Sequence, residues 1–165
     1  VLDTLRWIKQ ESSVWLEITN LIIPKANDDP GEIGQMCEWI RDNLGSDVPI
    51  HFTAFHPDYR MMNTPRTPAQ TLVKAREIAI QVGLNYVYVG NIDDPDRQST
   101  YCPGCGELVI ARHRHDVGTY QLDQSNCRFC GHSITGHFGD NAGHWGTRRM
   151  PVDPSLLLRS LEMEN

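Results

Sequence analysis

Four cysteines of this chain have a spacing that is typical of metal ligands. They form two Cys-x-x-Cys pairs, each followed by glycine: Cys102 with Cys105, and Cys127 with Cys130. Each pair can aim two thiolates at one point, and the glycine lets the chain curl so that backbone N–H groups face the sulfur atoms. Two such turns supply four ligands to a tetrahedral ion, so we predict a metal site of the zinc-ribbon or rubredoxin type.

Disulfides or four buried thiols are the alternatives to a metal ion. Nothing else in the sequence is typical of a secreted protein, so disulfides fit poorly. Four cysteines complete a closed site, which favours structural zinc over redox iron and leaves little need for the histidines that follow, which are His132, His137 and His144. Cys37 lies in a helical pattern, where we predict a buried or half-buried thiol.

The composition is that of an ordinary globular protein. The chain has 165 residues, of which 39% are hydrophobic and 22% are charged, enough for one domain and a small appendage. The net charge of −6 argues against broad nucleic-acid affinity, although Arg112, Arg114 and Arg148-Arg149 make local basic spots. No apolar run reaches transmembrane length and no signal peptide is visible, so we expect a cytoplasmic protein with no membrane partner.

Helical and strand patterns alternate over residues 1–92. Apolar residues at the helical period predict the helices, and runs of β-branched and aromatic residues predict the strands. The helices span 1–11, 30–44 and 67–82, and the strands span 14–23, 50–55 and 86–89. The apolar run 14–23 favours a sheet covered on both faces. This order predicts an α/β fold with a parallel sheet, and half a barrel fits it as well as half a doubly wound sheet.

The character of the sequence changes after Asn91. Residues 93–100 are polar, and we predict a linker there. Two short strands between the cysteine pairs, over 108–112 and 119–122, complete a ribbon over 100–135. Residues 136–165 form a tail rich in Gly, Pro, His and Arg, in which 155–164 could make a short helix.

Residues that directly follow the predicted strands are candidates for a binding site. Functional side chains of parallel α/β sheets gather at the carboxyl ends of the strands. His56 follows the second strand and could bind a carboxylate or a ribose oxygen, or act as an acid or base near neutral pH. A loop histidine bonded to the backbone is an equally weighted alternative. Asn27 and Asp28 follow the first strand and are more typical of helix caps than of ligands.

Two polar residues of the first strand share one face. Glu17 and Thr19 lie two positions apart, so their side chains point the same way. Inside a barrel a carboxylate there would have a polar role, whereas on an outer face it would be unremarkable. His51 begins the next strand, and we predict a structural role for it.

Segments from several parts of the chain carry a family resemblance. They are Trp15 to Pro24, Asn27-Asp28, Pro49 to Pro57, Thr67-Pro68 with Ala75-Arg76-Glu77, Gly83 to Cys105, the second cysteine pair, and Trp145-Gly with Arg148-Arg149. Together they resemble radical S-adenosylmethionine (SAM) enzymes of the pyruvate formate-lyase activating type. More narrowly, they resemble the radical SAM member of the system that pairs such an enzyme with Memo-like proteins. The stretch 83–105 is the specific part of the match.

The resemblance implies a partial (β/α) barrel in which a 4Fe–4S cluster reductively cleaves SAM to a 5′-deoxyadenosyl radical. It implies that His56 contacts SAM after the last barrel strand, and that Thr19, or Glu17 on the same face, contacts it from the strand before. The family's Cys-x-x-x-Cys-x-x-Cys cluster motif and its Gly-Gly-Glu-type motif are absent from the sequence. We therefore expect a C-terminal portion with the rear wall of the pocket and the zinc ribbon, which does not cleave SAM alone.

The chain starts at Val1 inside a helical pattern, so we expect the rear part of something longer. Its first partner would be the missing N-terminal barrel half, and its second a Memo-like protein or another protein substrate. We expect the missing half to cover an apolar inner face and the edge of the first strand, and its loss to cause poor solubility or oligomerisation. Two other functions stay open: a non-catalytic zinc-ribbon interaction module from a split gene, and rubredoxin-like electron transfer with iron in the four thiolates.

Overall fold

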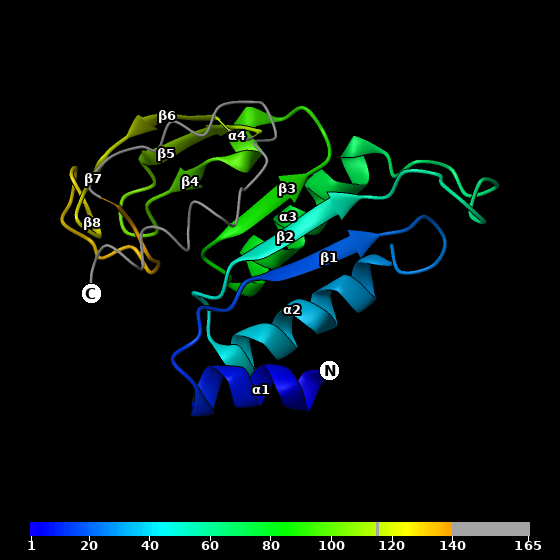
Figure 1. Ribbon diagram of the computed structural model, residues 1–165, viewed down its shortest axis with the longest axis horizontal. Helices are drawn as coiled ribbons and strands as arrows, with labels where there is room; N and C mark the ends of the chain where they lie inside the picture. Colours follow the sequence, from blue (N-terminus) through cyan, green and yellow to red (C-terminus); the bar gives the residue numbers. More distant parts are fainter. Residues whose placement is uncertain (115, 140–165) are drawn as a thin grey trace, which may run out of the picture.

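The computed structural model describes residues 1–114 and 116–139 of the chain (Figure 1). Its first part contains α1 (Leu2–Glu11), β1 (Ile18–Ile22), α2 (Pro30–Leu44), β2 (Ile50–Ala54), α3 (Ala69–Val82) and β3 (Val87–Gly90). The three strands form one parallel sheet in the order β1-β2-β3, and a helix connects each strand to the next. The predicted α/β fold with a parallel sheet is confirmed.

The ends of α2 follow from local chemistry. The side chain of Asp29 accepts hydrogen bonds from the backbone N–H groups of Gly31 and Glu32, at 2.9 and 3.0 Å, and caps the helix. Asn27 and Asp28, the predicted caps, instead hold the preceding turn, because they accept bonds from backbone N–H groups within it. The helix ends at Gly45, whose φ of 96° is a conformation that glycine adopts without strain.

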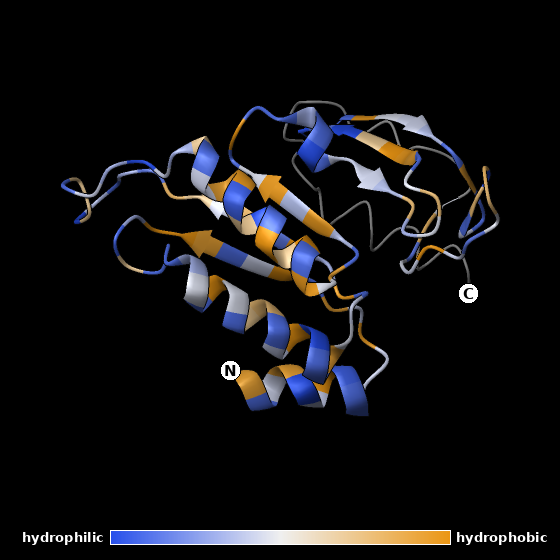
Figure 2. Ribbon diagram, turned by 180° about the vertical axis from the view of Figure 1, so that it is seen from behind, coloured by the Kyte–Doolittle hydropathy of each residue, from blue (hydrophilic) through white to orange (hydrophobic). Residues whose placement is uncertain are grey.

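Helices α2 and α3 cover one face of the sheet, and α1 packs beyond α2 (Figure 1). Figure 2 shows that apolar residues recur between polar ones along both helices. The buried core here contains Ile33, Cys37, Ile40 and Leu44 from α2, Leu72, Ala75 and Ala79 from α3, and Ile50, Phe52 and Ala54 from β2. Cys37 is a buried thiol, as predicted, and burial raises its pKa to about 11, so it stays neutral at physiological pH.

The sheet differs from the prediction in β1 and on its second face. β1 begins at Ile18 rather than Val14, because pairing with β2 starts where Ile18 lies opposite Ile50. No helix in the described part of the chain covers the opposite face, and Leu21 on it is 43% exposed. Its other residues are mostly polar, so the expected apolar inner face is wrong: strict alternation in β2 places apolar residues toward the helices and polar ones opposite.

β1 is an edge strand. It pairs with β2 on one side, and no strand in the described part of the chain pairs with its other side. Within residues 1–114 and 116–139, the first strand therefore has the unpaired edge that the sequence predicts. Such an edge is a template for pairing with a further strand.

The second part of the chain is a set of short antiparallel strands. It contains α4 (Pro95–Gln98), β4 (Thr100–Tyr101), β5 (Leu108–His113), β6 (Asp116–Tyr120), β7 (Leu122–Asp123) and β8 (Asn126–Cys127). The predicted linker 93–100 thus includes a helical turn, capped by the Asp94 side chain, which accepts from Arg97 N at 3.1 Å. The turn is too short for its apolar period to be visible in the sequence.

This ribbon packs against the end of the sheet through a second core. Tyr86, which directly precedes β3, is 3% exposed among ribbon residues such as Val109 and Ile134. Its hydroxyl accepts a hydrogen bond from Thr135 N at 3.2 Å, and Thr135 Oγ1 donates to Asp47 Oδ2 at 3.1 Å. The ribbon is therefore anchored to the sheet by buried packing and by polar contacts.

Thr67 gives a testable prediction for this fold. Its buried hydroxyl donates to Ile22 O and accepts from Phe55 N at 2.9 Å, joining the end of β1 to the end of β2. Thr67→Val keeps the shape but removes both bonds, so we expect a loss of about 1–3 kcal/mol in the free energy of unfolding, measured by urea titration. Thr67→Ser keeps the hydroxyl and is the control. An equal loss in both variants would contradict the role of the hydroxyl.

Some sequence expectations fall outside the described residues. They concern the helix over 155–164, His144, Trp145, and Arg148-Arg149. Within the described ranges, none of the helices has the length and apolar character needed to cross a lipid bilayer.

Candidate functional site

The four predicted metal ligands come together in the ribbon. Their sulfur atoms all lie within 4.8 Å of one another. Cys102 Sγ lies 3.6 Å from Cys130 Sγ, and Cys105 Sγ lies 3.8 Å from Cys127 Sγ. A tetrahedral ion with metal–sulfur bonds of about 2.3 Å needs sulfur–sulfur distances of about 3.8 Å, whereas a disulfide needs about 2.05 Å. The cluster therefore fits a metal ion such as zinc and does not fit disulfides.

The two cysteine turns have the same local structure. Gly106 N donates to Cys102 O and Gly131 N donates to Cys127 O, both at 2.8 Å. The two glycines have φ values of 77° and 75°, in the left-handed region that favours glycine. The curl that the sequence predicts for each Cys-x-x-Cys-Gly turn is confirmed.

Backbone N–H groups face the sulfur atoms in both turns. Cys102 Sγ accepts from the N–H groups of Cys105 and Gly104, and Cys127 Sγ accepts from those of Cys130 and Phe129. Such donation favours the thiolate form, whereas burial raises the pKa of Cys102 above its usual value, so a bound cation is needed to complete deprotonation there. The ribbon is thus preorganised for a cation, while the choice between zinc and iron stays a prediction, because both bind four thiolates.

The described histidines near the ribbon are not part of this cluster. His132 packs against Gly104, where an added Cβ would lie 2.9 Å from the His132 side chain. His137 instead makes an edge-to-face contact with Trp15, with ring centroids 5.6 Å apart. The four cysteines are complete without either residue.

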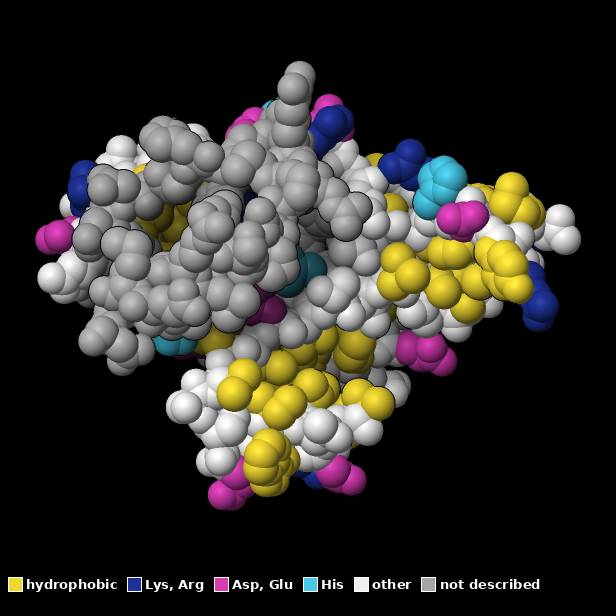
Figure 3. Space-filling view, viewed as in Figure 1, with side chains coloured by type: hydrophobic (Ala, Val, Ile, Leu, Met, Phe, Trp, Pro, Cys, Tyr) yellow, Lys and Arg dark blue, Asp and Glu magenta, His cyan; other side chains and the backbone are white. Residues whose placement is uncertain are grey.

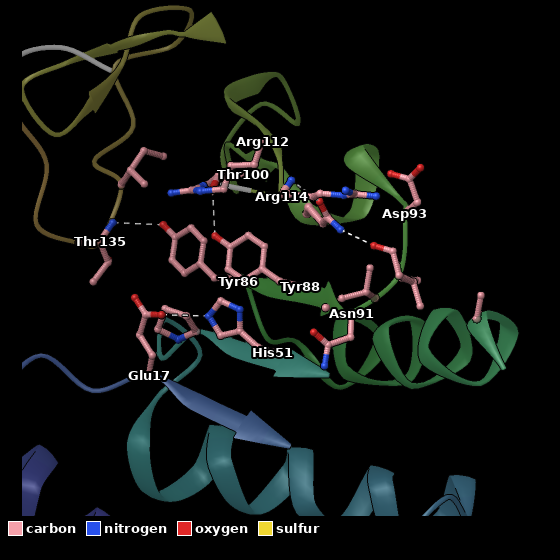
Figure 4. Close-up of a pocket in the computed structure, with 18 of the residues that line it drawn as sticks. Glu17, His51, Tyr86, Tyr88, Asn91, Asp93, Thr100, Arg112, Arg114 and Thr135 are labelled. Atoms are coloured by element: carbon pink, nitrogen blue, oxygen red, sulfur yellow. Dashed lines mark hydrogen bonds and ion pairs between the residues drawn. The ribbon is translucent and has the colours of Figure 1, made fainter. Parts of the chain in front are cut away.

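A cavity of about 1330 Å³ lies between the open face of the sheet and the ribbon. Figure 4 shows its lining side chains, which come from the segment before β1, from β2 and β3, and from the ribbon. Polar residues alternate with apolar ones along the strands, and the polar ones point to this face. The ribbon closes the cavity from the opposite side. The lining residues therefore lie far apart in the sequence.

Glu17 and His51 form a pair on the sheet side of the cavity. Glu17 Oε2 lies 2.9 Å from His51 Nε2, and Glu17 Oε1 accepts from Trp15 Nε1 at 2.8 Å. The His51 ring stacks on Tyr88, with centroids 4.9 Å apart and planes at 26°. Parallel pairing produces this contact, because His51 lies opposite Thr19 on one side and Tyr88 on the other.

A further set of hydrogen bonds joins the sheet to the ribbon. Tyr88 OH lies 3.0 Å from Thr100 Oγ1, which also accepts from Arg112 Nη1 at 2.8 Å. Burial raises the pKa of Tyr88 above its usual value, so its phenol is neutral at physiological pH. Tyr88 can therefore offer a hydroxyl, but not a negative charge, to the cavity.

The structure separates the three residues that the resemblance assigns to SAM. Glu17 lines the cavity and is paired with His51. Thr19 is exposed on the open face of β1, and His56 is exposed just beyond β2, and neither lines this cavity. His51, for which we predict a structural role, lies in the cavity wall instead. The alternation of polar and apolar residues over 50–54 is the sequence signal for its position.

Comparison with known proteins gives a relative without an assigned activity. No family model matches the sequence. The chain is similar to the uncharacterized protein MJ0808 of Methanocaldococcus jannaschii, with 41% identity over 136 residues. The match covers 81% of this chain and 40% of that protein, so the chain spans less than half of the relative's length.

Proposed function

We propose that this chain is the C-terminal portion of a radical SAM enzyme of the activating type, with three strands of a partial barrel and a zinc ribbon. The observation that carries the proposal is the division of the sheet into a helix-covered apolar face and an open polar face that lines a large cavity. Helices on one face of a parallel sheet are typical of a barrel wall, whose strands present functional groups at their ends.

Two further observations support a longer protein. The edge of β1 has no strand partner among the described residues, so a further strand can pair there. The archaeal relative extends well beyond the match, since only 40% of it is covered. In the proposed whole protein, His56 contacts SAM together with Thr19 or Glu17, and the missing barrel half supplies the rest of that pocket.

The cysteines of this chain do not fit a 4Fe–4S cluster of the radical SAM kind. Four of them form the ribbon site, and Cys37 is buried in the helix–sheet core. Each Cys-x-x-Cys pair also has the wrong spacing for the three-cysteine motif of the family. The proposal therefore assigns the cluster to another part of the protein, and no reaction step is assigned to this chain alone.

The proposal is tested first at the DNA level, upstream of the Val1 codon. We expect an open frame that encodes Cys-x-x-x-Cys-x-x-Cys. The encoded protein, reconstituted with iron and sulfide under anaerobic conditions and reduced, is expected to release 5′-deoxyadenosine from SAM. His56→Ala should lower that release, whereas His113→Ala, on an exposed ribbon histidine to which the proposal assigns no contact with SAM, should not. A stop codon directly upstream with no such motif nearby would overturn the proposal.

A non-catalytic interaction module is the second candidate, and exposed apolar residues favour it. Figure 3 shows hydrophobic side chains gathered at the tip of the loop after β2, where Tyr59 is 79% and Met62 is 66% exposed. Phe129, between two ribbon cysteines, is 55% exposed. Exposed apolar patches of this kind mark surfaces for partner proteins. A partner that binds the isolated chain and is lost in Met62→Ser or Phe129→Ser, with no motif upstream, would favour the module.

A further inference from the structure

We propose that the cavity between the sheet and the ribbon binds a small organic anion, through the guanidinium groups of Arg112 and Arg114. The anionic group is a carboxylate or a phosphate ester, and the body of the ligand is an unsaturated ring. This inference goes beyond the proposed function, because it depends on the charge and shape of the cavity and not on radical chemistry.

The charged residues that line the cavity favour an anionic ligand. Arg66, Arg112 and Arg114 all line it, and none of them is within 4.0 Å of a carboxylate oxygen in the described part of the chain. Its two acidic residues are already paired: Glu17 with His51 at 2.9 Å, and Asp93 with His113 at 3.0 Å. The lining therefore has an excess of positive charge, although the whole chain has a net charge of −6. A concave site lined by one sign of charge concentrates ligands of the opposite sign.

The arginines of the ribbon are positioned by polar contacts that do not neutralise them. Arg112 Nη1 donates to the neutral hydroxyl of Thr100 at 2.8 Å. Arg114 N donates to Gln98 Oε1 at 3.0 Å, and Gln98 Nε2 donates to Ile92 O at 2.7 Å, which fixes the backbone that carries the Arg114 side chain. The Arg112 guanidinium is therefore held in the wall, the Arg114 side chain extends from a fixed backbone, and both keep N–H groups for a ligand. Planar guanidinium groups match carboxylate and phosphate oxygens in pairs of hydrogen bonds.

Aromatic rings line the part of the cavity wall between the arginines and the Glu17–His51 pair. Figure 4 shows Arg112 and Arg114 on one side of Tyr86 and Tyr88, and the Glu17–His51 pair on the other. Trp15 and His137 line the same space. Ring faces favour a flat unsaturated body over a branched aliphatic one. The second ring nitrogen of His51, which has no protein partner among the described residues, is available to a polar group at the far end of the ligand.

The charge balance also distinguishes this ligand from SAM. SAM carries a sulfonium and an ammonium group against one carboxylate, so it is a net cation. An arginine-rich lining repels that net charge and favours a ligand with a net negative one. We therefore expect the anion to bind in its own right, and SAM to bind this chain more weakly than the anion does.

Calorimetric titration of the metal-loaded chain tests the proposal with four probes: phenyl phosphate, benzoate, the neutral analogue benzyl alcohol, and SAM. We expect saturable binding of at least one of the two anions, weakened by added salt, and much weaker binding of benzyl alcohol and SAM. Arg114→Gln is expected to raise the dissociation constant about tenfold, because it removes a charge-assisted pair of hydrogen bonds. Arg112→Gln should have a similar effect.

Arg60→Gln is the matched control, since Arg60 is exposed in the loop after β2 and does not line the cavity. The proposal is overturned if neither anion binds, if benzyl alcohol binds as well as benzoate, or if Arg114→Gln behaves like Arg60→Gln. Arg114 is exposed, so its variant is expected to fold even if Arg112→Gln does not. No cluster and no SAM cleavage enter this titration, so its outcome is independent of the proposed enzymatic function.

Discussion

Replacing Cys102 with serine is expected to release the ribbon's metal ion and to unfold the ribbon, while the helix–sheet core stays folded. A serine hydroxyl does not replace a thiolate as a ligand, and Cys102 is also only 2% exposed in the ribbon core. A structural zinc site supplies on the order of 10 kcal/mol of folding free energy, more than a core as small as the ribbon's can replace. The measurement is metal content by mass spectrometry together with limited proteolysis of the ribbon.

Cys37→Ala is the control for this prediction. It also removes one cysteine, but Cys37 belongs to the other core, so the metal content should stay at about one ion per chain. Metal content and protease resistance that survive Cys102→Ser would contradict the assignment of the site. The same analysis identifies the metal: zinc leaves the protein colourless, whereas ferric iron in four thiolates colours it red and would favour electron transfer.

The second large effect is expected from Phe52→Ala. Phe52 is 0% exposed on the central strand β2, on the face that packs against α2 and α3. Truncation of a buried phenylalanine removes apolar contacts and leaves a cavity, which costs about 3–5 kcal/mol. That is a large fraction of the stability of a domain of this size, so we expect the urea midpoint to fall sharply and some of the chain to unfold.

Phe129→Ala makes the same chemical change on the surface. Because Phe129 is 55% exposed, the change in the free energy of unfolding should be within about 0.5 kcal/mol. Both variants are compared by urea titration under identical metal loading. Equal losses would mean that the helix–sheet core does not determine the stability of the chain.

The elements predicted well are those with their own local signals. Pro30 and Gly45 bound α2 as the sequence predicts, and Gly83 ends α3 in a left-handed conformation. The four ribbon cysteines also needed no tertiary information, because the geometry of each pair is set within five residues of chain. Local chemistry is enough where a turn or a cap is determined by residues in contact along the sequence.

Features that depend on pairing between distant segments were predicted less well. The apolar run 14–23 has high strand propensity, yet only residues opposite β2 become strand, so β1 is shorter than the run. His51 acquires its position from Glu17 and Tyr88, which are brought beside it by parallel register. The cavity also needs the ribbon to dock on the sheet, and no periodicity in the sequence encodes that contact.

The hydrogen bond from Thr135 N to the Tyr86 hydroxyl links metal binding in the ribbon to ligand binding in the cavity. Thr135 belongs to the segment after the second cysteine pair, and Tyr86 leads directly into the strand that lines the cavity. A ligand that touches both walls therefore favours the folded, metal-loaded ribbon over the metal-free one. By reciprocity, ion and ligand strengthen each other's binding by the same factor, so chelation of the metal should weaken a site that contains none of its ligands.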